Sequence, residues 1–130
     1  DAHLVGKKIS AEHLQIDFAY SSPANRALHT AMIFLRNLKY PLSNFEIATD
    51  LYDFSGNQIL DFIKRADNNL QTILVFGHNH AFTHLVNSLG NFYIENVPTS
   101  GFVHIKFDED SWANISQGTT IKTVFPKQLK

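Results

Sequence analysis

Two kinds of hydrophobic pattern follow one another between Thr72 and Gly90. Ile73–Phe76 is a continuous apolar run, which is typical of a short strand buried on both faces. After a break at Gly77, apolar residues recur at helical spacing: Ala81, Phe82, Leu85, Val86 and Leu89. Gly90 then stands where a helix C-cap is expected. The pattern predicts a buried strand, a turn at Gly77 and a helix that ends at Gly90.

A second strand–turn–helix pattern lies earlier in the chain. Apolar and polar residues alternate from Ile16 to Ser21, which predicts a strand. Ser22 and Pro23 follow, and they suit a helix N-cap and the first helical turn. An apolar stripe at helical spacing then continues to Leu38. The sequence therefore predicts a helix with Arg26 in its first turn.

The other predicted elements are shorter. In chain order they are the end of an amphipathic helix over 2–9, a strand over 45–48, a helix over 55–65, strands over 102–107 and 119–125, and a polar tail from Pro126. Ser55 and Gln58 have capping-box spacing at the start of the third of these.

Strands and helices thus alternate along most of the chain, and two strands close it. This order predicts an α/β fold, a three-layer sandwich around a mostly parallel central sheet, with the closing strands antiparallel at an edge. The 130 residues contain no internal repeat or linker, so residues 1–130 are expected to form a single domain.

Composition narrows the classes of function. Apolar residues make up 44% of the chain and charged residues 18%, which suits a globular protein with a real core. The net charge of −1 gives no sign of a nucleic-acid or membrane partner. The absence of cysteine excludes disulfides and thiol chemistry, and no apolar run suits a membrane span or a secretory signal. We expect a cytoplasmic protein, and the sequence does not indicate its oligomeric state.

His78 and Asn79 stand where the central strand ends and the next helix begins. Ligands of open parallel sheets bind outside the carboxyl ends of the strands, and a helix N-terminus attracts anions. His78 is therefore a candidate for handling a phosphate, unless it is only a polar loop residue. Arg26 could reach the same edge of the sheet, where its guanidinium would match a phosphate dianion. The alternative is a solvated surface arginine.

Asp53 follows Leu51 and Tyr52 in a loop that could also lie above the sheet. A carboxyl group there could protonate a leaving oxygen if burial raised its pKa. The alternative is an acidic residue near the N-terminus of the next helix.

His78, His80 and His84 form a possible metal-binding set. His80 and His84 are four residues apart on one helix face, a spacing that binds zinc in some enzymes. No cysteine or nearby acidic residue completes the set, and a helix N-terminus repels a cation. A zinc-dependent hydrolase therefore remains one alternative function.

Several segments resemble motifs of one family, the histidine phosphatase superfamily. Ser21–Ala27 with Thr30 and Ala31 resembles its S-S-P-x-x-R-A-x-x-T-A segment, and Val75–Asn79 resembles its strand ending in Gly-His-Asn. Asn96–Gly101 is similar to the N-x-P-T-x-G region of the small SixA-type phosphohistidine phosphatases, and Leu51–Asp53 to the loop of the same branch. The resemblance runs along essentially the whole chain, in the right order.

The resemblance implies a phosphoglycerate mutase-like fold and a phosphatase that acts on a phosphohistidine or another small phosphomonoester. Arg26, His78 and Asn79 would bind the phosphoryl group, and His78 would be the second active-site histidine. Asp53 would lie near the position of the general acid. His80 departs from the pattern, in which proline is usual. No cofactor or metal is implied, and the partner would be a phosphorylated protein or a small phosphorylated substrate.

One part of the family pattern is missing. The family's nucleophile is a histidine in an Arg-His-Gly or Arg-His-Ala motif at the end of the first strand, and no Arg-His pair occurs here. We expect that strand and its loop, about 30 residues, to precede Asp1. The chain alone is then expected to bind oxyanions weakly without turnover. A catalytically inactive phosphate-binding module is the other alternative.

Overall fold

The computed structural model describes residues 1–130. Its α-helices are α1 (Ala2–Ser10), α2 (Asn25–Asn37), α3 (Asn57–Lys64) and α4 (Asn79–Leu89). Its strands are β1 (Phe18–Ser21), β2 (Phe45–Ile47), β3 (Ile73–Phe76), β4 (Phe102–Lys106) and β5 (Thr119–Val124). The predicted order of elements is confirmed, although Pro126–Leu129 forms a short 3-10 helix where a polar tail was expected. None of the helices combines the length and the apolar character that crossing a bilayer requires.

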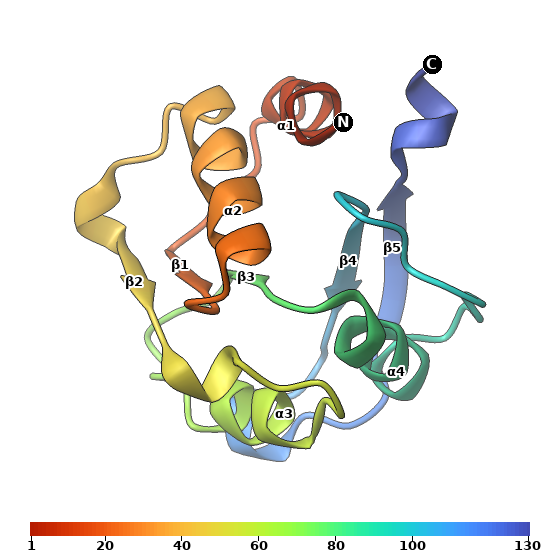
Figure 1. The fold of residues 1–130 in the computed structure, drawn as a ribbon. Coiled ribbons are helices and arrows are strands. Elements are labelled where there is room, and N and C mark those ends of the chain that lie inside the picture. Colours follow the sequence, from red (N-terminus) through yellow and green to blue (C-terminus); the bar gives the residue numbers. More distant parts are fainter.

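The strands form two separate sheets. β1 lies between β2 and β3, and all three run parallel, with Ser21 opposite both Ile47 and Phe76. β4 and β5 pair only with each other, and they are antiparallel. The mostly parallel central sheet is therefore confirmed, while the closing pair forms a sheet of its own instead of the edge of the first (Figure 1).

Two helical layers cover the sheets from opposite faces (Figure 1). α1 and α2 pack on one face, where Ala19 and Phe76 of the parallel sheet join Phe102 and Val124 of the β4–β5 sheet in one apolar cluster. α3 and α4 cover the other face and pack against side chains of β1, β3 and β4. Because the same layers cover both sheets, the two sheets form a single interrupted middle layer of a three-layer sandwich.

β3 is less buried than the sequence predicts, since the pattern indicated a strand buried on both faces. Only Phe76 is buried, and Ile73, Leu74 and Val75 remain partly exposed. β3 pairs with β1 along one edge, and its other edge carries no strand. The apolar pattern is typical of a central strand, whereas β3 has a neighbouring strand along only one of its two edges.

Candidate active site

Two strand–helix turns meet at one edge of the parallel sheet. Ser21 and Phe76 are paired across β1 and β3, so both strands end at the same level. α2 begins just after β1 and α4 just after β3, and neither helix has a side-chain cap on its first N–H groups. Two helix N-termini with free donors thus lie at this edge, an arrangement that favours an anion. Arg26, His78 and Asn79 line the same cavity there.

His78 holds its imidazole in the mouth of this cavity. The residue is the N-cap of α4, in an extended conformation with φ −82° and ψ 139°. Its Nε2 is buried and has no hydrogen-bond partner. A buried polar nitrogen without a partner is costly and rare in proteins. The nitrogen therefore has no hydrogen-bond partner within residues 1–130.

Arg26 lies in the first turn of α2 and is exposed to solvent. Its guanidinium takes part in none of the ion pairs of the chain, whereas Arg65 pairs with Asp50 at 2.8 Å. An arginine without an acidic partner at the rim of a cavity keeps all its donors free for an oxyanion.

A tight turn before β4 closes the site from the other side. Asn79 donates a hydrogen bond from Nδ2 to Thr99 Oγ1 at 3.0 Å. The turn itself is closed by a 2.9 Å bond from the Gly101 N–H to the Pro98 carbonyl, and Ser100 adopts a left-handed φ of 65°. Left-handed backbone in a residue other than glycine is uncommon and recurs at functional sites.

Asp53 lies next to this site but turns its carboxylate inward. It accepts hydrogen bonds from Ser55 N and Oγ and from the N–H groups of Gly56, Gln58 and Ile59, at 2.9 to 3.2 Å. Burial raises the pKa of Asp53, but these hydrogen bonds together outweigh it and lower the pKa below its ordinary value. Asp53 therefore caps α3 as a carboxylate. Its role as a general acid stays a prediction, and an ionised carboxylate has no proton to donate.

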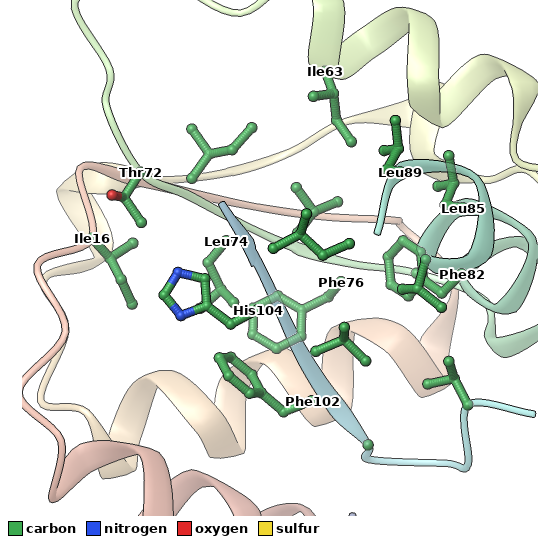
Figure 2. Close-up of a pocket in the computed structure, with 18 of the residues that line it drawn as sticks. Ile16, Ile63, Thr72, Leu74, Phe76, Phe82, Leu85, Leu89, Phe102 and His104 are labelled. Atoms are coloured by element: carbon green, nitrogen blue, oxygen red, sulfur yellow. The ribbon is translucent and has the colours of Figure 1, made fainter. Parts of the chain in front are cut away.

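An apolar cavity of about 1000 Å³ separates β3 from β4. Figure 2 shows side chains pointing into it from both strands and from the helices of the α3–α4 layer. Among them are Leu74, Phe76, Phe82, Leu85 and Phe102. His104 of β4 also lies there, and burial lowers its pKa, with Lys122 lowering it further and Glu12 opposing both. The cavity therefore lies where the middle layer is interrupted, between β3 and β4.

β3 and β4, which form two walls of the cavity, run in opposite directions. The Asn79–Thr99 bond joins the residues after β3 to those before β4. At the far end, Trp112 follows β4 and donates hydrogen bonds from its N–H to Asn68 Oδ1 at 3.0 Å and from Nε1 to the Leu70 carbonyl at 2.7 Å. β4 therefore starts at the level where β3 ends. A strand between them would be parallel to one wall and antiparallel to the other.

The predicted zinc set does not form. No group of three or more histidine, cysteine or acidic side chains in the chain could hold a metal ion. His78 packs against Tyr52 and Phe54. His80 is exposed in the first turn of α4, and His84 lies beside Gly56 on the α3 side. The alternative of a zinc-dependent hydrolase is therefore not supported, because the three imidazoles face different surroundings.

Three residues near the site, Thr99, Tyr52 and Phe54, are not among the site residues that the sequence predicts. Thr99 was noted only as part of a motif, although its hydroxyl anchors Asn79. Tyr52 and Phe54 contact the His78 ring. The sequence carries no signal for Tyr52 and Phe54, because the acidic Asp53 is buried while the two aromatic residues are exposed.

The fold has close counterparts among solved structures, although no protein-family model and no curated protein matches the sequence. The protein histidine phosphatase SixA in complex with tungstate is 21% identical, with a TM-score of 0.77, over 100% of this chain and 81% of that one. Putative SixA phosphohistidine phosphatases from Agrobacterium tumefaciens and Nakamurella multipartitia are each 16% identical over 96% of this chain. The two matches span 77% and 80% of those chains, with TM-scores of 0.72 and 0.71. The chain therefore has the phosphoglycerate mutase-like fold of the SixA phosphohistidine phosphatases.

Proposed function

We propose that the protein is a phosphatase that hydrolyses a phosphohistidine or another small phosphomonoester. The nucleophile would be a histidine on a strand that is not part of residues 1–130 and that occupies the cavity between β3 and β4. The observation that carries this proposal is that Arg26, His78 and Asn79 line one cavity together with the apolar residues of β3 and β4. An oxyanion site thus lies where the end of an inserted strand would arrive.

The size and lining of the cavity fit one strand. With a strand spacing of about 4.8 Å, a layer about 10 Å thick and a rise of about 3.3 Å, each residue of a strand takes up about 160 Å³. A cavity of about 1000 Å³ lined by both β3 and β4 has room for a short strand. Protein interiors hold few voids larger than a water molecule, so an apolar space of this size calls for an occupant. The free edges of β3 and β4 would supply its hydrogen-bond partners.

The direction of the proposed strand determines which of its ends lies next to His78. A strand parallel to β3 would complete a four-stranded parallel arrangement and end at the level of Phe76, next to His78. The residue that follows its last position would then face the phosphoryl group held by Arg26 and the helix N-termini. This placement suits a nucleophilic histidine, because the carboxyl ends of parallel strands carry the site in such sheets.

The chemistry would run in two displacements. A nitrogen of the strand histidine attacks phosphorus, and the bond between phosphorus and the leaving group breaks. The leaving atom takes up a proton from solvent, and the water that attacks in the second step returns one. Water then attacks the phosphohistidine, releases inorganic phosphate and restores the free histidine. Arg26 and His78 would hold the equatorial oxygens in both steps, so positioning and electrostatics supply most of the rate.

The solved structures support this proposal by their names. One of them is a protein histidine phosphatase that binds tungstate, a tetrahedral oxyanion of the same shape as phosphate. Transferring this activity to the present chain rests on the shared fold together with Arg26, His78 and Asn79 at the sheet edge. The alternative, a catalytically inactive phosphate-binding module, rests only on the absence of an Arg-His pair from residues 1–130.

The test is hydrolysis of phosphohistidine by the complete protein, compared with a His78→Asn variant. His78→Asn should lower kcat by about 10²- to 10³-fold, the usual loss when one donor to the transition state is removed. His29→Asn is the matched control, because His29 is exposed on α2 and should leave the rate unchanged. Equal rates for the His78 variant and the wild type would contradict the proposal. Residues 1–130 alone should show no turnover.

A further inference from the structure

A second histidine lies at the rim of the proposed phosphate site. His80 is the second residue of α4 and follows His78 by two positions. It lines the same cavity as Arg26, His78 and Asn79. His80 is exposed to solvent and belongs to none of the ion pairs of the chain. Its imidazole therefore has no charged partner inside the fold, and it is in contact with both the cavity and the surrounding water.

The helix face that carries His80 is turned toward the loop before α3. Residues four apart share one face of a helix, and His84 stands one turn after His80. His84 lies beside that loop, since a Cβ placed on Gly56 would lie 3.4 Å from His84 Cδ2. Asn79 is turned the other way, toward Thr99, to which it donates a hydrogen bond. His80 therefore lies on the α3 side of the site.

No other side chain at this end of the cavity is free to donate a proton. Five hydrogen bonds hold the carboxylate of Asp53 against the start of α3, where its oxygens act as acceptors. Arg26 keeps its protons, because a guanidinium does not deprotonate in proteins. His78 faces the phosphoryl oxygens in the proposed function. The remaining titratable side chains of the lining belong to β4 or to the segment after it: His104, Lys106, Glu109 and Asp110.

We propose that His80 is a catalytic residue of the phosphatase, which gives a proton to the leaving oxygen of a phosphomonoester and takes one from the water that attacks in the second displacement. This inference rests on the proposed function and adds to it the route of the proton. Because His80 is exposed, the same imidazole also exchanges its proton with solvent between turnovers.

The proton cycle closes over the two displacements. In the first, the bond from the strand histidine to phosphorus forms, the bond from phosphorus to the leaving oxygen breaks, and the His80 imidazolium gives that oxygen a proton. The leaving group departs as a neutral alcohol. In the second, the water oxygen bonds to phosphorus, the phosphorus–nitrogen bond breaks, and the neutral His80 takes one proton from the water. Histidine suits both roles, because imidazole changes its charge close to neutral pH.

Two esters with different leaving groups test the inference on the complete protein. Phenolate is a poor leaving group that needs a proton, whereas dinitrophenolate leaves without one. General acid–base catalysis contributes about 10²- to 10⁴-fold, so His80→Gln should lower kcat/KM for phenyl phosphate by that factor and leave dinitrophenyl phosphate unchanged. The ratio kcat/KM is the quantity to compare, because it covers only the steps up to release of the leaving group.

A matched control and a rescue separate proton transfer from a structural role. His84→Gln changes the same residue type one turn further along α4, outside the cavity lining, and should leave both substrates unaffected. His80→Ala removes the imidazole entirely. Imidazole added to the solution should then restore part of kcat/KM for phenyl phosphate in His80→Ala, and should not raise it in the wild type.

The outcomes separate this inference from the proposed function. Equal losses for both esters in His80→Gln, or no loss for phenyl phosphate, would overturn the proton role of His80 and leave the phosphatase standing. Turnover of phosphohistidine without turnover of either ester would have the same meaning. A wild type that hydrolyses none of the three substrates would overturn the proposed function, and the role of His80 with it.

Discussion

Asn79 and Thr99 are joined by a hydrogen bond of 3.0 Å from Nδ2 to Oγ1, and this bond links the first turn of α4 to the turn before β4. The two residues come from opposite walls of the cavity between β3 and β4. Their contact closes the site end of the cavity and holds the left-handed Ser100 in place beside the proposed phosphate position.

Removing the hydrogen bond between Asn79 and Thr99 should weaken anion binding at the site. Thr99→Val keeps the size of the side chain but removes the acceptor, so the loop loses one of its ties to α4. Loss of one net hydrogen bond predicts about twofold to tenfold weaker binding of tungstate or phosphate. Isothermal titration measures it, with Thr119→Val on the exposed end of β5 as the control. Unchanged affinity in Thr99→Val would show that the bond does not shape the site.

Asp53 should stabilise the protein by capping α3. Asp53→Ala leaves several N–H groups at the start of the helix without an acceptor, and we expect a loss of about 1–2 kcal/mol in the free energy of unfolding. Asp50→Ala is the matched control, because its partner Arg65 is a surface residue and such pairs contribute about 1 kcal/mol or less. Urea denaturation compares them. Equal losses in the two variants would rule out a special role for the Asp53 cap.

The carboxylate of Asp53 should also make the free energy of unfolding depend on pH. The pKa of Asp53 is lowered from its ordinary value of 3.8, so the folded state binds its proton less readily than the unfolded state does. Its contribution is therefore present above about pH 4 and is lost as the pH falls through the folded-state pKa. The difference in stability between the wild type and Asp53→Asn should shrink below pH 4. A difference that grows there would contradict the capping account.

Arg26 should supply much of the affinity for oxyanions. A charge-assisted pair with phosphate contributes about 1.5–3 kcal/mol, so Arg26→Gln predicts roughly 10- to 150-fold weaker binding. Arg36→Gln on the last turn of the same helix is the control and should bind as the wild type does. Titration with phosphate at constant ionic strength makes the comparison. Similar affinities for the two variants would place the anion elsewhere.

His104 should make the protein less stable in mild acid. Burial lowers the pKa of His104 from 6.5, Glu12 opposes the shift and Lys122 adds to it. The folded state then binds less proton than the unfolded state, so stability falls as the pH drops below about 6.5 toward the folded-state pKa. His104→Gln should flatten that part of the profile of unfolding free energy against pH. The exposed His29→Gln should retain the full slope.

The sequence predicted the elements correctly, and the structure brings Arg26, His78 and Asn79 to one edge of the parallel sheet. The run Ile73–Phe76 and the break at Gly77 located β3 and the start of α4, and the Ser22–Pro23 pair located the start of α2 near Arg26. These signals are local, because the alternation and helical spacing of apolar residues reflect which face of each element is covered.

The packing of the elements against one another could not be predicted from the sequence patterns. Apolar spacing predicted β3 as buried on both faces, but it does not reveal that β3 pairs with a strand along only one edge. The capping-box spacing of Ser55 and Gln58 suggested the wrong cap, because Asp53 reaches the same N–H groups from outside the helix. Both features depend on tertiary contacts that residue spacing alone does not encode.

The central claim is that a histidine outside residues 1–130 attacks the phosphoryl group beside His78. The most direct test is to incubate the complete protein with a phosphorylated substrate, quench it, and locate the phosphohistidine by mass spectrometry. We predict the label on a histidine that lies outside residues 1–130, at the end of the strand in the cavity, and on none of the seven histidines within them. A phosphoryl group on His78 itself, or on any other of these seven, would contradict the account.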